Sequence, residues 1–566
     1  MRDTILFPKL NYLEIEYLEK LTTLWFRYYI KFPILKEFRI ESCPQMDAFI
    51  FDDKVGVPSL QKMRISKMEN LKMIWHNQLD GDSFSKLKSL EVDRCQKLLA
   101  LFPSNICGRL LSLESLDVWR CGSLEEIFDL QGIISEERNS IASTQSRELC
   151  FSNLQELKVS RCQSLKYLFA ASNNVANDEY SPKFLFPKLT SLRLWILPEL
   201  RSFYPGRHTV EGPVLKRLDQ YDCFIHDTDE EGQMQMQYLF CLVKQAFPCL
   251  EQLNLAGKNL MMMWQGQVPE SLFVKLKILD VYFDDSTCLP LCIIQRFQNL
   301  EKLSIDTSSY KEIFSNGEDQ TQAATPTRIK KLYLSQLDDV KYMWKPDFKL
   351  DLILQNLEAL NIRWCNSLIN VMPPSASFQN LTVMQVVDCR SLINIGTSSA
   401  VKSLVQLSEM TILLCKNIIE VVGNHGDVTD DEIIFPKLKR LSLRDLPSLT
   451  SFCSWKVTLQ FPSLEELIVV KCPQMKIFSQ GVLHTPTLWK VEIDDESIEL
   501  CPNVDINKTI QQFHENVNAK NMLWLQKDNE LEKAEQQLDE ETNVQSSIKD
   551  CEGSSSHHLE IKGDPV

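Results

Sequence analysis

Apolar residues recur along this chain in one short frame, Leu-x-x-Leu-x-Val, which x-x-Cys follows in many copies. The frame is plain at Leu87, Leu90, Val92 and Cys95. Eighteen copies begin 24 to 41 residues apart, and only one copy, at Gln220, has a polar residue in the third apolar position. Repetition at such a period is the signature of a solenoid, in which each unit buries its apolar face only against its neighbours. The frames begin at Leu10, Leu35, Leu60, Leu87, Leu113, Leu154, Leu189, Leu215, Leu250, Leu276, Leu300, Ile329, Leu357, Leu381, Leu407, Leu438, Leu464 and Leu488.

The alternation inside the frame predicts one β-strand per repeat, with its Leu and Val side chains on the buried face. A Phe stands three residues before the frame in eleven of the eighteen copies, and Pro often follows it. Pro suits the entry of a strand because it cannot donate to the ladder. We therefore predict a β-rich α/β fold: a horseshoe-shaped solenoid with a concave parallel sheet of about 18 strands and a mostly irregular convex side.

A second apolar pattern follows each strand and carries an aromatic residue, as at Leu124, Ile127 and Phe128. Trp75 and Phe169 stand at the same place in other repeats. Because these aromatic residues repeat in phase with the strands, we expect them to stack as a spine inside the coil. An aromatic binding stripe is the less favoured interpretation.

The point at which the repeat frames stop, and the longer intervals between some frames, determine the predicted domain organisation. We expect residues 1–502 to form the solenoid, 503–542 to form a tail with an amphipathic helix over about 508–541, and 543–566 to be disordered. We expect the tail to cap the solenoid rather than pair with a partner helix, because Lys520 and Lys527 interrupt its apolar seam. Apolar residues at helical spacing predict a short convex helix over 233–247, and polar loops are expected at 129–150, 170–183, 315–327 and 424–434.

Composition narrows the classes of function. The 566 residues carry a net charge of −15, which disfavours nucleic-acid binding because phosphate contacts need a basic face. The sequence contains no apolar run long enough for a membrane span and no signal-peptide core at Met1, so we expect a cytoplasmic protein, with the nucleus as the other compartment.

The 18 cysteines do not indicate disulfides or zinc. Nine of them occupy one position of the repeat, where a small weak donor turned inward can meet backbone carbonyls. A reducing compartment disfavours disulfides, and Cys288 and Cys292 have no second ligand pair for a metal. No phosphate-binding loop and no nucleophile elbow is found, so we expect no enzyme, no cofactor and no metal.

The outward positions of the strands are the candidate protein-binding residues. Two neighbourhoods are rich in Trp, Tyr, Phe and Arg, most of them residue types enriched in interface hot spots. Stacking between strands, which would stabilise the sheet, is the alternative interpretation. The first neighbourhood contains Arg94, Trp119, Arg120, Arg161, Arg193 and Trp195, and the second contains Tyr282, Phe283, Tyr333, Arg363 and Trp364.

Two longer patterns give the chain a family resemblance. Leu-x-x-Leu-x-Val-x-x-Cys alternates with Phe-Pro-Lys-Leu-x-x-Leu-x-Leu-x-x-Leu-Pro-x-Leu, which spans Phe186–Leu200 and Phe435–Leu449. This combination resembles the leucine-rich repeats of plant intracellular immune receptors of the coiled-coil, nucleotide-binding class, over roughly residues 7–495.

The resemblance implies a non-catalytic module of innate immunity that detects a pathogen effector or a guarded host protein and restrains a nucleotide-binding module. That module and the signalling coil are absent from the sequence, so we expect no nucleotide binding by this chain alone. Since little precedes Leu10, the chain is expected to be a fragment or to dock its first coil on a partner. Two alternatives remain open: a substrate-recognition subunit of a ubiquitin ligase, and a truncated, non-signalling remnant.

Overall fold

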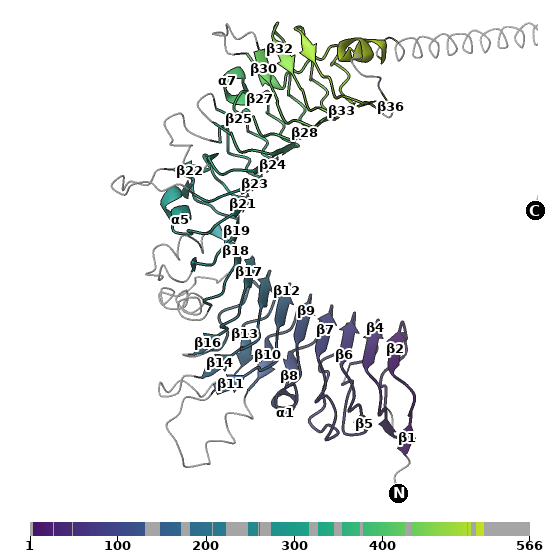
Figure 1. Ribbon diagram of the computed structural model, residues 1–566. Coiled ribbons are helices and arrows are strands. Elements are labelled where there is room, and N and C mark those ends of the chain that lie inside the picture. The colour runs from purple at the N-terminus through teal and green to yellow at the C-terminus, as the bar shows by residue number, and fades with distance from the viewer. Residues whose placement is uncertain are drawn as a thin grey trace, which may run out of the picture.

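The repeat frames wind into a curved solenoid whose main strands line the inner side of the curve (Figure 1). This computed structural model describes residues 4–25, 28–47, 49–130, 148–170, 182–205, 208–221, 247–257, 260, 273–315, 327–343, 354–373, 377–424, 432–494, 496–499, 505–513 and 515. The helix predicted at 233–247 lies outside the described residues except for Phe247, and most of the four predicted loops and all of the tail beyond 515 lie outside them as well.

Each of the eighteen frames supplies one strand of the concave sheet, as the periodicity predicts. Neighbouring strands pair in parallel and in register, so that Leu90, Leu116 and Leu157 lie side by side. The parallel strands are β2 (Tyr12–Glu16), β4 (Glu37–Glu41), β6 (Lys62–Ser66), β7 (Ser89–Asp93), β9 (Ser115–Trp119), β12 (Glu156–Ser160), β15 (Ser191–Trp195), β17 (Arg217–Tyr221), β18 (Gln252–Ala256), β19 (Ile278–Tyr282), β21 (Lys302–Asp306), β23 (Lys331–Ser335), β24 (Ala359–Arg363), β26 (Val383–Val387), β28 (Glu409–Leu413), β31 (Arg440–Arg444), β33 (Glu466–Val470) and β35 (Lys490–Ile493). The last strand, β36 (Glu496–Glu499), pairs antiparallel with β35.

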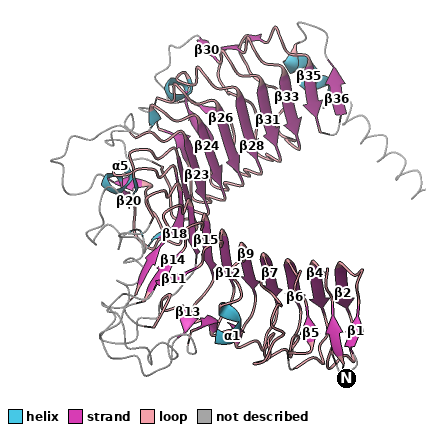
Figure 2. Ribbon diagram, turned by 60° about the horizontal axis from the view of Figure 1, so that its bottom comes forward, coloured by secondary structure: helices cyan, strands magenta, loops and turns pink. Residues whose placement is uncertain are grey.

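Short parallel ladders also join the return segments of neighbouring coils, so the convex side is more regular than the frame alone predicts. One kind stands just before the entry to the concave strand, where each of these copies has Phe, Pro or both: β1 (Thr4–Leu6) with β3 (Tyr29–Lys31) and β5 (Val55–Gly56), β11 (Glu148–Cys150) with β14 (Lys183–Leu185) and β16 (Thr209–Glu211), and β30 (Glu432–Ile434) with β32 (Thr458–Gln460) and β34 (Leu483–His484). The other kind follows the concave strand: β8 (Ala100–Phe102) with β10 (Glu126–Asp129) and β13 (Tyr167–Ala170), β20 (Leu289–Pro290) with β22 (Phe314–Ser315), and β25 (Asn370–Met372) with β27 (Asn394–Thr397) and β29 (Val422–Gly423). Helices α1 (Ser104–Cys107), α5 (Leu291–Gln295) and α7 (Ser398–Val401) lie away from the concave sheet (Figure 1), and Figure 2 shows the same for α1 and α5.

The core runs the length of the solenoid between the concave sheet and the return segments. Leu116 and Val118 are fully buried, as the pleat predicts. The predicted aromatic spine is confirmed: the ring of Phe102 stacks on that of Phe128 at 5.0 Å between centroids, and Phe128 stacks on Phe169 at 5.0 Å. Trp75 continues the stack and satisfies its indole N–H by donating to the Leu101 carbonyl at 2.8 Å.

The residue after most concave strands has a left-handed backbone conformation, which sets the direction of that surface residue and of the residue that follows it, often a Cys. Among the described residues, every non-glycine residue with positive φ except Phe84 directly follows a concave strand. This left-handed residue points outward, and its N–H extends the ladder, as when Arg94 donates to the Trp119 carbonyl at 2.8 Å. The next residue then turns inward, where the Cys121 thiol donates to the carbonyls of Trp119 and Val92 at 3.6 and 3.9 Å.

The two ends of the solenoid differ. In the first coil Leu13 and Ile15 are only half-buried, whereas their counterparts in the next coil are buried. At the other end, residues 506–513 are helical and bury Ile506 and Ile510 against the last coil. Asn507 fastens this helix, because its Oδ1 accepts from the Phe478 N–H at 2.8 Å.

Candidate protein-binding surface on the concave face

Three rows of side chains from each strand face the hollow of the solenoid. In β9 these rows contain Ser115, Asp117 and Trp119, while Leu116 and Val118 point into the core. The parallel register carries each row unchanged from coil to coil, so that Asp93, Trp119 and Ser160 are neighbours in the third row. The left-handed residues after the strands form a fourth row at the rim of the sheet.

Trp119 is the centre of a cation–π cluster in the first predicted neighbourhood. The guanidinium of Arg120 lies 4.6 Å from the indole centroid and that of Arg94 lies 5.3 Å from it. Each such contact is worth about 0.5–1 kcal/mol at an exposed site. The stacking alternative is therefore realised within the protein, since Arg94 reaches across from the neighbouring coil. The indole nevertheless keeps 36% of its surface exposed, which leaves an aromatic face for a further contact.

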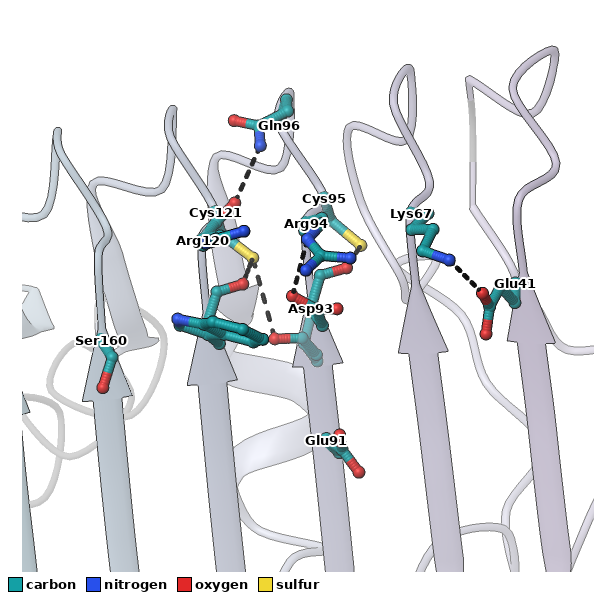
Figure 3. Close-up of polar contacts among 12 residues, drawn as sticks. Glu41, Lys67, Glu91, Asp93, Arg94, Cys95, Gln96, Arg120, Cys121 and Ser160 are labelled. Atoms are coloured by element: carbon teal, nitrogen blue, oxygen red, sulfur yellow. Dashed lines mark hydrogen bonds and ion pairs between the residues drawn. The ribbon is translucent and has the colours of Figure 1, made fainter. Parts of the chain in front are cut away.

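Four consecutive coils place a basic side chain at the rim, and we call Lys67, Arg94, Arg120 and Arg161 the basic ridge. All four have φ between 52° and 55°, so the same turn presents each of them. Figure 3 shows Lys67, Arg94 and Arg120 beyond the ends of adjacent strands. Lys67 was not among the predicted residues. The sequence does mark Lys67, because it stands two residues after the third apolar residue of its frame. The next residue, Met68, occupies the position where other copies have Cys.

Two of the four ridge cations have carboxylate partners and two do not. Lys67 Nζ lies 2.6 Å from Glu41 Oε1, and this hydrogen bond lowers the pKa of Glu41. Arg94 Nε lies 3.8 Å from Oδ1 of Asp93, a buried carboxylate oxygen without a hydrogen bond. Arg120 and Arg161 have no ion pair within the described residues. The ridge therefore offers two guanidinium groups to an anionic partner.

The remaining two members of the first neighbourhood form a separate network. Arg193 stacks on Trp195 at 5.4 Å, but its Nε also donates to Asp219 Oδ2 at 3.1 Å. Asp219 is fully buried on the concave face and accepts further hydrogen bonds from Arg217 and Asn254. Ser160 stands between Trp119 and Trp195 in the third row. Asp219 escaped the sequence analysis because its burial depends on long side chains of neighbouring coils.

The members of the second predicted neighbourhood come from three strands, β19, β23 and β24, with β21 between the first two. Phe283 and Trp364 occupy the rim row, at the ends of β19 and β24, with 38% and 42% of their surfaces exposed. Tyr282 and Arg363 lie in the third row, whereas Tyr333 lies in the central row under the Lys302 ammonium at 4.9 Å. The register thus places Arg363 and Trp364 beside β23 but three strands from Tyr282. Sequence reasoning missed the apolar surface next to Trp364, to which Val387, Leu413 and Leu414 contribute.

The buried cysteines are poor candidates for chemistry. Desolvation raises the pKa of Cys472 to about 12, so its thiol stays protonated near neutral pH. The described part of the chain holds no group of three or more His, Cys, Asp or Glu side chains arranged for a metal ion. Among its helices, none combines the length and the apolar character that crossing a membrane requires.

Comparisons with solved structures find similar chains at low identity. A chain of the Toll–Spatzle complex of Drosophila is 15% identical with a TM-score of 0.28, and the match covers 72% of this chain and 61% of that one. A chain of the mouse RP105/MD-1 complex is 12% identical with a TM-score of 0.25, covering 84% and 91%. A chain of the plant peptide hormone receptor RGFR1 bound to RGF2 is 13% identical with a TM-score of 0.18, covering 81% and 82%. The chain thus spans less than two thirds of the matched Toll-complex chain.

Comparison with protein families identifies the repeats themselves. No curated protein matches the chain in sequence. The family described as "Plant disease resistance protein RPS2-like, leucine-rich repeats" matches residues 59–149, 249–377 and 376–485, more than half of the 566 residues. Repeats of this kind are typically non-catalytic scaffolds for protein interaction. The chain belongs to the leucine-rich-repeat family of RPS2-like plant disease resistance proteins.

Proposed function

We propose that this chain is a recognition module of plant innate immunity, which binds a pathogen effector or a guarded host protein on the concave face of its N-terminal coils. It would also regulate a nucleotide-binding switch supplied elsewhere, as the family suggests. The observation that carries the proposal is the contiguous surface of Arg94, Trp119 and Arg120, where two guanidinium groups lie 5.3 and 4.6 Å from the ring centroid of a Trp that is 36% exposed.

The size of the face supports a protein as the ligand. Eighteen strands about 4.8 Å apart make a surface about 80 Å long. A standard protein interface uses about 20–30 residues on each side, so one partner fits on part of this face. Truncation of an Arg or Trp at the centre of such a contact typically costs the complex more binding free energy than truncation of other residue types. Arg120, which has no carboxylate partner within the described residues, favours an acidic patch on that partner.

To test the proposal, a binding partner is first captured with the intact chain as bait. The partner is then identified and purified for affinity measurements. The double substitution Trp119→Ala and Arg120→Ala should weaken its binding by at least thirtyfold, because Trp119 is exposed and Arg120 half-buried on the concave face, and their loss removes contact surface without opening the core. Replacing Lys416 and Lys456 by Gln removes exposed charge from another part of the solenoid and should leave affinity unchanged. An unchanged affinity of the double variant, with an unchanged circular dichroism spectrum, would refute the proposal.

A further inference from the structure

The charge of the basic ridge that has no carboxylate partner is concentrated in two neighbouring coils. Lys67 and Arg94 lie 2.6 and 3.8 Å from a carboxylate oxygen, whereas Arg120 and Arg161 have no ion pair within the described residues. The Arg120 N–H donates to the Ser160 carbonyl at 2.9 Å, so these two arginines stand at adjacent ends of the paired strands β9 and β12 (Figure 3). The unpaired charge is therefore a compact pair of cations and not a line of four along the rim.

Two adjacent guanidinium groups select the charge and the shape of their ligand. One carboxylate carries a single negative charge and leaves one of the two cations unpaired. A phosphomonoester carries a charge of about −1.5 to −2 at pH 7 and three acceptor oxygens, so one group accepts charge-assisted hydrogen bonds from both arginines. The phosphodiesters of a nucleic acid carry about −1 each, and a chain of net charge −15 repels them. Arg120 and Arg161 together thus fit a phosphorylated side chain on a protein.

The aromatic residue beside this pair narrows the choice of phosphorylated side chain. Trp119 directly precedes Arg120, whose guanidinium lies 4.6 Å from the ring centroid of the indole. The Trp keeps 36% of its surface exposed. Phosphotyrosine joins an aromatic ring to its phosphate, so the ring can contact the indole while the phosphate meets the guanidinium groups. Phosphoserine and phosphothreonine have no ring and gain only the contacts with the cations.

From this arrangement we propose that the surface of Trp119, Arg120 and Arg161 binds a phosphotyrosine of the partner protein. The site deepens the proposed function and rests on it, since the same face recognises the same partner. Tight binding then depends on phosphorylation of the partner. The dianion compensates both cations, whereas an unmodified tyrosine is neutral and leaves them unpaired.

Fluorescence anisotropy with short synthetic peptides and the full-length chain tests the site without the immune partner. The probe is a labelled peptide with one phosphotyrosine between alanines and glycines. It is compared with the same peptide carrying tyrosine or glutamate in place of the phosphotyrosine. The phosphotyrosine peptide should bind about tenfold tighter than either, because only the dianion pairs with both guanidinium groups. Equal affinities of the three peptides would overturn the proposal.

Variants of the chain locate the binding. Arg120→Gln with Arg161→Gln should weaken the binding of the phosphotyrosine peptide by about tenfold, because the charge-assisted hydrogen bonds are lost. Arg328→Gln with Arg390→Gln removes two exposed guanidinium groups from other coils and should leave the affinity unchanged. Equal losses in the two double variants would contradict binding at the rim of β9 and β12.

A phosphoserine peptide of the same design tests the contact with the indole. Trp119→Ala should weaken the phosphotyrosine peptide by about threefold or more and leave the phosphoserine peptide unchanged, because only the first carries a ring. Trp364→Ala, which removes an indole that is 42% exposed on another coil, is the matched control. Equal losses of the two peptides in the Trp119 variant would overturn the choice of phosphotyrosine.

Two further measurements use the unaltered chain, so they do not depend on the folding of a variant. At equal ionic strength, inorganic phosphate should displace the phosphotyrosine peptide more effectively than chloride, and equal displacement would contradict a phosphate site. Phosphatase treatment of the recovered partner should weaken its binding to the chain by about tenfold. If binding survived the phosphatase but was lost in the double variant of Trp119 and Arg120, the phosphotyrosine anchor would be wrong and the proposed function would stand.

Discussion

The coils of strands β6 to β12 and those of strands β24 to β28 share one backbone but present different surfaces. Both end their strands with a left-handed residue followed, in most copies, by an inward Cys. In the N-terminal region the left-handed residues are the basic ridge. In the C-terminal region they are Trp364, Asp388 and Leu414. The frame therefore fixes the fold, while the residue at this one position decides whether the rim is cationic, as in the N-terminal region, or mixed apolar and acidic, as at Trp364, Asp388 and Leu414.

The largest effect should be common to both regions, because the core is the same in both. Leu116 of β9 and Leu360 of β24 are each no more than 1% exposed. Replacing either by Ala removes buried methyl groups and leaves a cavity, which should lower the free energy of unfolding by about 2–5 kcal/mol. Urea unfolding followed by circular dichroism measures the loss. A large difference between the two variants would mean that the regions do not share an equivalent core.

Partner binding should separate the two regions. The pair Trp119→Ala and Arg120→Ala should cost about 2 kcal/mol of binding free energy, and the wild-type interaction should weaken between about 0.05 and 0.5 M salt because exposed charges are screened. The pair Trp364→Ala and Leu414→Ala removes apolar surface without altering charge, so any effect it has should be independent of salt. Titrations by calorimetry at both salt concentrations decide this. If binding at the basic ridge did not depend on salt, the predicted electrostatic difference between the two regions would be wrong.

The sequence predicts the repeated parts well for a physical reason. Burial of Leu116 or stacking of Phe128 depends on positions that recur in phase, so periodicity alone reveals them. The contacts between side chains on the concave surface cannot be predicted from the periodicity alone. Trp119 and Arg120 are predicted as outward residues, but their cation–π contact depends on side-chain direction. The hydrogen bond from Arg193 to Asp219 joins adjacent strands and therefore depends on their register. It also depends on Arg217, which donates to the same carboxylate.

The Arg193 and Asp219 network is local to the middle of the solenoid and should contribute less than the core. Asp219→Ala removes a buried carboxylate that accepts from Arg193, Arg217 and Asn254. The arginine side chains keep 31% and 40% of their surfaces exposed, so water can replace part of the lost bonding. We expect a loss of about 1–2 kcal/mol in the free energy of unfolding. Ser442→Ala, in the same row of the C-terminal region, should change it by less than about 0.5 kcal/mol, and an equal effect would argue against the network.

The smallest predicted effect compares the convex ladders of the two regions. Glu126 pairs with Tyr167 and Ala100 in the ladder of β10, whereas the corresponding position of β27 is the neutral Asn394. Burial, together with the nearby charges of Asp129 and Glu125, raises the pKa of Glu126 to about 7 from its ordinary value of 4.5. The folded state therefore binds the proton more tightly than the unfolded state between these two values.

The sign of the pH dependence follows from that difference. The stabilisation by protonated Glu126 is complete below about pH 4.5 and is lost as the pH rises to about 7. Because the side chain is partly exposed, solvent screening limits the loss to about 1 kcal/mol. Glu126→Gln mimics Asn394 and should remove this decline, so that the variant is more stable than the wild type at pH 7.5 and nearly equal to it at pH 4.5. Unfolding free energies measured across that range decide it, and parallel curves for the two proteins would mean that Glu126 titrates as an ordinary surface carboxylate.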